Sequence, residues 1–153
     1  MADRSTQIMI KPIGWVKSRV KETPKPGYDW RAVASEIVVD SSLAAAIDGL
    51  ERSSHIIVIY WMHQAADPAK MALKVRYRGD PELPLVGLFA SRSPYRPNPL
   101  GQKVVRLLRL QGNVLQVEGL DAVDGTPVID IKPYIPGYDS VGDARVPPWS
   151  DSK

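Results

Sequence analysis

The stretch SHIIVIYWMHQ, Ser54–Gln64, is the strongest strand signal in this sequence. Its centre, from Ile56 to Tyr60, consists of β-branched and aromatic residues, the types that are enriched in strands. The run is apolar almost without interruption, whereas a strand with one face in water alternates apolar and polar residues. We therefore expect Ser54–Gln64 to form a strand that is largely covered on both faces.

Shorter stretches on either side of this strand also favour β structure. Turn residues predict two hairpins, one around Gly112 and one through the Asp124-Gly125 dipeptide. An opening extended segment and four further strands are expected at Thr6–Val16, Ser35–Asp40, Ala72–Gly79, Asn113–Leu120 and Pro127–Tyr134.

One segment differs from these strands. Asp40–Glu51 begins with Asp and Ser residues suited to capping, continues through an alanine-rich body and has Gly49 near its end. We expect it to be the main helix. Many short strands at short spacing with one helix predict a mostly β, α+β fold, namely a single-domain β-barrel or a tightly curled sheet.

The composition is that of an ordinary globular domain. The chain has 153 residues, of which 44% are apolar and 24% are charged. It contains no cysteine, which excludes disulfides, thiolate nucleophiles and cysteine-ligated zinc. We expect no membrane span and no signal peptide, because no long apolar run occurs, and we expect a cytoplasmic protein. The net charge of +3 leans only mildly toward anionic partners.

Several familiar chemistries lack their motifs. Neither the GxGxxG nor the GxxxxGK(S/T) nucleotide-binding motif occurs, and no GxSxG nucleophile motif is present. The two histidines, His55 and His63, would lie about 26 Å apart on one straight strand, so we expect no metal site. Each histidine has either a structural role or a role in another kind of site.

The loop SRSPYRPNPLG, Ser91–Gly101, combines stiffness with charge. Its three prolines fix their own φ angles and restrict the residues before them, so that the loop has little conformational entropy to lose on binding. Arg92 and Arg96 present planar forks suited to carboxylates or phosphates, and Asn98 is held between two prolines. The alternative is a rigid barrel corner whose arginines are simply solvated.

Three motifs, in order, resemble those of one family. GLFASRSPYRPNPLGQKVV and LDAVDGTPVIDIKPYIP are similar to the two signatures of the TrmO family, also called the TsaA-like or YaeB family, and SHIIVIYWMHQA resembles its histidine-containing strand. The resemblance covers roughly Ile8 to Asp139. It implies a TsaA-like β-barrel domain over residues 1–140, followed by a C-terminal tail over residues 141–153.

The resemblance also implies a function. Members of this family are S-adenosylmethionine-dependent methyltransferases built on a β-barrel rather than a Rossmann sheet, in keeping with the missing GxGxxG. Characterised relatives methylate the exocyclic nitrogen of threonylcarbamoyladenosine beside the tRNA anticodon and work as homodimers. Some bacterial members carry an extra C-terminal domain, which this chain is expected to lack. Cofactor contacts are implied at Lys25, Pro26, Gly27, His63, Gln64, Arg92, Gln102, Asp124, Gly125, Thr126 and Pro127.

The implied reaction needs help at the acceptor, because the lone pair of a urea nitrogen is delocalised. Asp124 and Asp130 are the candidate catalytic bases, with His63 third. Asp124 is alternatively only a turn residue that accepts backbone N–H bonds. Donor and acceptor each bring a carboxylate. We expect Arg92 and Arg96 each to bind one of these two carboxylates, with Asn98 also facing the substrate. An Arg96→Ala change would then raise the KM for modified tRNA more than that for the donor.

RNA and a second copy of the chain are the expected partners. Lys74, Arg76 and Arg78 alternate with apolar residues, so one strand would place all three charges on an RNA-binding face, or on a face that is merely solvated. The apolar strand Ile56–Met62 and the tail, with Trp149 as an anchor, predict a homodimer with the donor pocket near its interface. Two alternatives to a tRNA methyltransferase remain open: a methyltransferase of another acceptor, and a non-catalytic module that binds S-adenosylmethionine or RNA.

Overall fold

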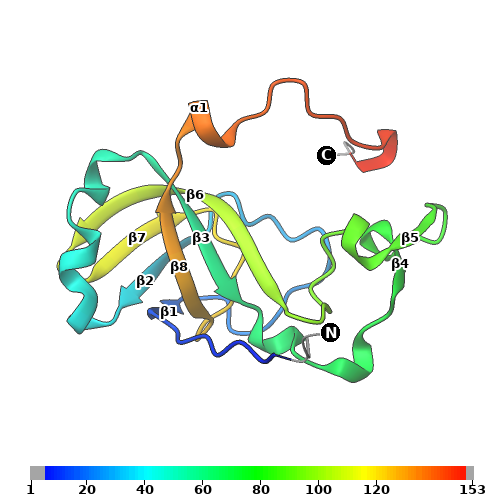
Figure 1. Ribbon diagram of the computed structural model, residues 1–153, viewed down its shortest axis with the longest axis horizontal. Coiled ribbons are helices and arrows are strands. Elements are labelled where there is room, and N and C mark those ends of the chain that lie inside the picture. The colour runs from blue at the N-terminus through cyan, green and yellow to red at the C-terminus, as the bar shows by residue number, and fades with distance from the viewer. Residues whose placement is uncertain (1–5, 151–153) are drawn as a thin grey trace.

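Six antiparallel strands form a closed barrel in the order β1-β2-β7-β6-β3-β8 (Figure 1). The computed structural model describes residues 6–150. Closure confirms the predicted barrel and leaves none of these strands with an open edge. The barrel strands are β1 (Gly14–Lys17), β2 (Ala34–Val39), β3 (His55–Trp61), β6 (Leu100–Gln111), β7 (Val114–Glu118) and β8 (Pro127–Pro133).

Strand β3 lies in the middle of the barrel wall, between β6 and β8. Ile56, Val58 and Tyr60 belong to the core cluster and are at most 4% exposed. Ile57, which points to the other face, is also buried. The prediction that this strand is covered on both faces is therefore confirmed for its first half. The stretch Ile56–Met62 therefore offers less apolar surface to a second chain than expected, namely its half-exposed residues Ile59, Trp61 and Met62.

A short ribbon projects from the barrel between β3 and β6 (Figure 1). It pairs β4 (Lys74–Arg76) with β5 (Leu85–Gly87), and single 3₁₀ turns surround it. The predicted strand Ala72–Gly79 is thus only three residues long. Arg78 has a left-handed φ of 53° inside the turn η5 (Tyr77–Gly79), so it does not share a strand face with Lys74 and Arg76 as expected. The four turns of this region that adjoin the ribbon are η3 (His63–Ala65), η4 (Pro68–Lys70), η5 and η6 (Leu88–Ala90).

The segment predicted as the main helix forms two 3₁₀ helices instead. They are η1 (Ser41–Ile47) and η2 (Leu50–Arg52), and the Asp40 carboxylate caps η1 by accepting the Ser42 N–H at 2.9 Å. Gly49 separates them with a φ of 89°. Seven residues cannot sustain an isolated α-helix, and the 3₁₀ form spans more length per residue between β2 and β3. The α-helix in the described part of the chain is the single turn α1 (Pro136–Asp139).

One predicted hairpin is present and one is not. β6 and β7 pair across a turn at Gly112, whose φ is 60°. A turn also forms at Gly125, where φ is 77°, but the strands on either side of it are not partners, because β7 pairs with β2 and β6 whereas β8 pairs with β1 and β3. The Gly125 N–H donates to Val16 O at 2.8 Å, so this turn closes against β1. Of the opening segment Thr6–Val16, only the end from Gly14 is a strand.

The tail returns to the projecting ribbon rather than to a free position in solvent. The Trp149 ring, in η7 (Pro148–Ser150), lies 5.6 Å from the Tyr77 ring, and the Tyr77 hydroxyl donates to Ser150 O at 3.2 Å. The first five residues of the predicted domain and the last three of the predicted tail lie outside the described residues. Within residues 6–150, no helix has the length and apolarity to cross a membrane, and no group of metal-ligating side chains gathers.

Candidate active site at one end of the barrel

A long loop between β1 and β2 is tied to the end of β3 by one side chain. The Gln64 side-chain oxygen accepts from the Thr23 N–H at 3.0 Å and from the Thr23 hydroxyl at 3.1 Å. Its amide nitrogen donates to Lys21 O at 3.0 Å. The Gln64 side chain thus makes its hydrogen bonds with a loop that lies about forty residues earlier in the chain.

The same loop is tied on its other side to the second signature. Asp124 accepts the Ser18 N–H at 2.8 Å with one carboxylate oxygen and meets the Lys21 ammonium at 2.9 Å with the other. The Asp124 N–H also donates to Val20 O at 2.7 Å. The Ser18 N–H, with help from the Lys21 charge, holds the pKa of Asp124 below its usual value. This carboxylate is therefore a weak base and an anchor for the loop.

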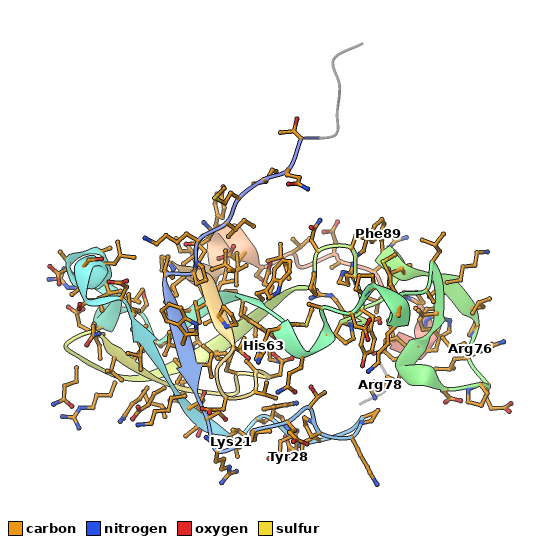
Figure 2. All side chains as sticks on the ribbon, turned by 90° about the horizontal axis from the view of Figure 1, so that it is seen from below. Lys21, Tyr28, His63, Arg76, Arg78 and Phe89 are labelled. Carbon is orange, nitrogen blue, oxygen red and sulfur yellow. The ribbon has the colours of Figure 1, made fainter. Side chains whose placement is uncertain are left out.

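The loop that these two anchors hold carries the predicted cofactor contacts Lys25, Pro26 and Gly27. Between the anchors and β2, Lys25-Pro26-Gly27-Tyr28 makes a turn closed by the Tyr28 N–H and Lys25 O at 3.3 Å, with a φ of 89° at Gly27. Proline followed by a glycine with positive φ is typical of a type II turn. Figure 2 shows Lys21 and Tyr28 along this loop, and His63 on the neighbouring segment.

His63 begins the turn that follows β3, so its position differs from that of His55 on the strand. Its Nδ1 is buried and has no hydrogen-bond partner within residues 6–150. His55, by contrast, shares a 2.8 Å hydrogen bond with the Ser54 hydroxyl. Buried polar atoms in proteins normally have a partner, so the His63 imidazole is prepared for a polar group that the folded chain itself does not supply.

The proline loop reaches the same end of the barrel. The Met62 N–H donates to Pro99 O at 2.7 Å, which fixes the loop beside His63. Within the loop, Arg96 Nη1 donates to Ser91 O at 2.9 Å and to Ser93 O at 3.2 Å. Arg96 also lies over the Phe89 ring, 5.6 Å from its centroid. The loop's second arginine therefore shapes the loop.

Arg92 and Asn98 are the loop's exposed polar side chains. Within the described residues, the structure gives neither side chain a hydrogen bond or an ion pair. The Arg92 charge lies close enough to Tyr60 to favour ionisation of its hydroxyl. Of the two arginines that the sequence singles out, Arg92 is the one available to an anion.

A buried tyrosine joins β3, the proline loop and the second signature. The Tyr60 hydroxyl donates to the Asp121 carboxylate at 2.5 Å, and burial, reinforced by that carboxylate, raises the pKa of Tyr60 far above its usual value. A Cβ atom on Gly101 would lie 2.4 Å from the Tyr60 ring. Only glycine lets the proline loop pack this closely. Neither Tyr60 nor Asp121 was predicted as a site residue, and the signal available for Asp121 was its place in the motif LDAVDGTPV.

The remaining predicted residues are spread over the barrel. Thr126 is 2% exposed and donates its hydroxyl to Val123 O at 2.7 Å, which stabilises the turn. Pro127 begins β8 opposite Trp15. Gln102 on β6 and Asp130 on β8 are the two register partners of Ile59, one on each side of β3. Asp130 forms an ion pair with Lys132 at 2.8 Å. Asp130 is thus placed along the barrel wall and not at the end where Gln64 and Asp124 hold the loop.

Comparisons with known proteins identify the family of this chain. The family model described as the tRNA-methyltransferase O N-terminal domain matches residues 16–140. The chain is 44% identical over 137 residues to an S-adenosyl-L-methionine-binding protein of Archaeoglobus fulgidus, covering 88% of this chain and 94% of that protein. A 38% identical match to a second protein of the same species covers only 37% of that longer protein.

Solved structures give the same family. A crystal structure of TrmO from Pseudomonas aeruginosa superimposes with a TM-score of 0.74 at 33% identity, covering 92% of this chain and 61% of that chain. The chain therefore spans less than two thirds of the solved structures it resembles. The predicted family and barrel are both confirmed, and the chain belongs to the TrmO family.

Proposed function

We propose that this chain transfers a methyl group from S-adenosylmethionine to the exocyclic nitrogen of threonylcarbamoyladenosine beside the tRNA anticodon. The observation that supports it most strongly is the anchoring of one loop from two sides. Gln64 and Asp124 belong to two separate motifs of the family, and both use their side chains to hold residues 18–23. Methyl transfer is an in-line displacement in which alignment contributes much of the rate, so a rigid frame is what the reaction needs.

The residues at this end of the barrel fit the cofactor. The buried Nδ1 of His63 lacks a partner among residues 6–150, the turn residues Lys25–Gly27 are exposed, and Arg92 is available for a carboxylate. When bound, S-adenosylmethionine supplies an electrophilic methyl on a sulfonium. We propose that His63 and the turn bind its polar groups and that Arg92 binds its carboxylate.

The groups weighed as catalytic bases differ in what they are free to do. Both oxygens of Asp124 have partners, and Asp130 is paired with Lys132 along the barrel wall. Of the three candidates, His63 is the one whose imidazole retains a heteroatom without a partner among the described residues. We propose that Nδ1 of His63 binds the cofactor while its other ring nitrogen, Nε2, accepts or relays the acceptor's proton, and that Asp124 acts by positioning the loop.

Substrate and assembly complete the proposal. Asn98, Lys74 and Arg76 remain proposed RNA contacts, since all three are exposed. We also propose a homodimer, with its contact on the projecting ribbon rather than on β3. Exposed apolar side chains gather there: Leu73 is 77%, Leu85 53% and Phe89 78% exposed. Phe89 adjoins the proline loop, so such a contact would lie near the proposed donor site.

Calorimetric titration with S-adenosylmethionine tests the cofactor site. We expect His63→Ala to weaken binding by about tenfold, which corresponds to the loss of one hydrogen bond to a buried partner. His55→Ala is the matched control, because that histidine is bonded to Ser54 and should bind the cofactor like the unchanged chain. Equal affinities for the two variants, or no binding to the unchanged chain, would contradict the proposed site.

A further inference from the structure

A second hollow lies beside the candidate site, on the outer surface where β1 ends. We call it the β1 groove. It contains three cations and one carboxylate, and two of its residues are buried serines. Its lining comprises Lys17, Ser18, Arg19, Lys21, Ala34, Ser35, Glu36, Leu108 and Gln116.

Alternation along the chain puts the three cations on one side. Val16 and Ser18 are 2% and 6% exposed, whereas the side chains of Lys17 and Lys21 are 75% and 66% exposed, and Arg19 between them is also exposed. β1 ends at Lys17 and the chain bends at Arg19, yet all three basic residues belong to the lining of the groove. VKSRVK therefore has the single-sided basic pattern that was expected of KVRYR.

Arg19 has no hydrogen bond or ion pair in the part of the chain that the structure describes. Lys17 meets Glu36 only at 3.9 Å, and Lys21 meets Asp124 at 2.9 Å. The groove's positive charge is thus only partly neutralised by the protein's own carboxylates. An exposed guanidinium with no partner is the group best suited to bind a phosphate through two parallel hydrogen bonds.

The groove is lined from the outer face of the barrel wall. Glu36 is the register partner of Lys17 on one side and of Gln116 on the other, and none of these three residues is buried. Ser35, in contrast, lies on the core face of β2 with Ile37 and pairs with the buried Val117. A ligand in the groove would therefore be bound by the outward-facing side chains and not by the Ser35 hydroxyl.

We propose that the β1 groove binds a backbone phosphate of the RNA, next to the nucleotide that is methylated. Lys21 connects the two places, because its ammonium contacts Asp124 and its carbonyl accepts from Gln64 while its side chain also lines the groove. Arginine, lysine and serine are the usual donors to phosphate, and such contacts set the register of the nucleic acid. This inference rests on the proposed function, since it supplies the RNA with a path to that site.

Four single variants test the groove by tRNA binding at several salt concentrations. We expect Arg19→Ala to weaken binding by about tenfold and to reduce the slope of log affinity against log salt by about one. Arg52→Ala is the matched control, since it removes the same charge from η2, away from the groove. Glu36→Gln removes the one carboxylate of the lining and should tighten binding by a few fold.

Ser35→Ala is a second control within the lining of the groove, because the Ser35 hydroxyl lies on the core face of β2, and it should leave tRNA binding unchanged. If the unchanged chain methylates tRNA but Arg19→Ala binds it like Arg52→Ala, the groove is wrong and the proposed function stands. If the unchanged chain binds no tRNA at all, both proposals are contradicted.

Discussion

Gln64 and Thr23 form a double contact in which one amide oxygen accepts both the backbone N–H, at 3.0 Å, and the hydroxyl, at 3.1 Å, of the same residue. The contact joins the segment after β3 to the loop after β1. Because the Gln64 nitrogen also donates to Lys21 O, the glutamine fixes the loop at two places. A motif residue expected to touch the cofactor is thus engaged first in building the site.

Gln64→Ala should loosen this loop without unfolding the barrel. We expect hydrogen exchange at the Thr23 amide to accelerate about fivefold, the effect of losing one ordinary hydrogen bond, and S-adenosylmethionine affinity to fall. Gln111→Ala, on the exposed β6–β7 hairpin, is the matched control. Unchanged exchange at Thr23 would show that the double contact does not hold the loop in solution.

Asp124→Asn should reveal a pH-dependent stabilisation. The folded state holds the pKa of Asp124 below its usual value in an unfolded chain, so the carboxylate stabilises the fold above that usual pKa, and the effect is lost as pH falls through the folded pKa. Thermal unfolding should separate the variant from the unchanged chain at pH 7, and the separation should shrink below about pH 4. Asp48→Asn serves as the control on an exposed carboxylate. A separation that is equal at pH 7 and pH 3 would contradict the role of the charge.

Gly101→Ala should destabilise the fold by about 1–3 kcal/mol, the usual cost of overpacking. Its Cβ would lie 2.4 Å from the Tyr60 ring, whose position is fixed by the Asp121 carboxylate. Gly87→Ala makes the same change in β5 where no atom lies within 4 Å, and it should be nearly neutral. Chemical denaturation of both variants measures the difference, and similar midpoints would refute the packing argument.

Arg96→Ala and Arg92→Ala should fail in different ways. Arg96 bonds two carbonyls of its own loop, so its loss should lower the melting temperature and raise the KM of donor and acceptor together. Arg92 has no such bonds within the described residues, and its loss should raise the KM for S-adenosylmethionine by about tenfold while leaving the melting temperature unchanged. This revises the equal division of two carboxylates expected from the sequence. A selective effect of Arg96→Ala on the tRNA KM would restore that division.

The barrel itself could be predicted because its signals are local. Runs of β-branched residues predict β3 and β8, and Gly112 predicts the turn between β6 and β7. The second hairpin could not be judged in this way. The Asp124-Gly125 turn is correct as a turn, but its partner is β1, about a hundred residues away in the chain. Strand pairing depends on the closure of the whole barrel, which a local pattern does not contain.

The site was predictable as a set of motifs but not as a set of roles. His63 and Arg92 remain available for ligands, whereas Gln64, Asp124 and Arg96 have partners within the chain. Motif membership alone does not distinguish a residue that contacts a ligand from one that positions the loop. The prediction that KVRYR forms one continuous strand face is wrong, because β4 ends at Arg76 and Arg78 has a left-handed φ angle. The alternation of residue types does not predict a φ angle of this kind.

Methyl transfer from labelled S-adenosylmethionine to tRNA, with and without the threonylcarbamoyl group, tests the central claim most directly. We predict transfer to the modified tRNA and none to tRNA that lacks the group, because the acceptor nitrogen is then without the substituent that Asn98 and its neighbours would recognise. Cofactor binding with no transfer to either tRNA would make the chain a binding module, and equal transfer to both would assign it a different acceptor; either result would contradict the account.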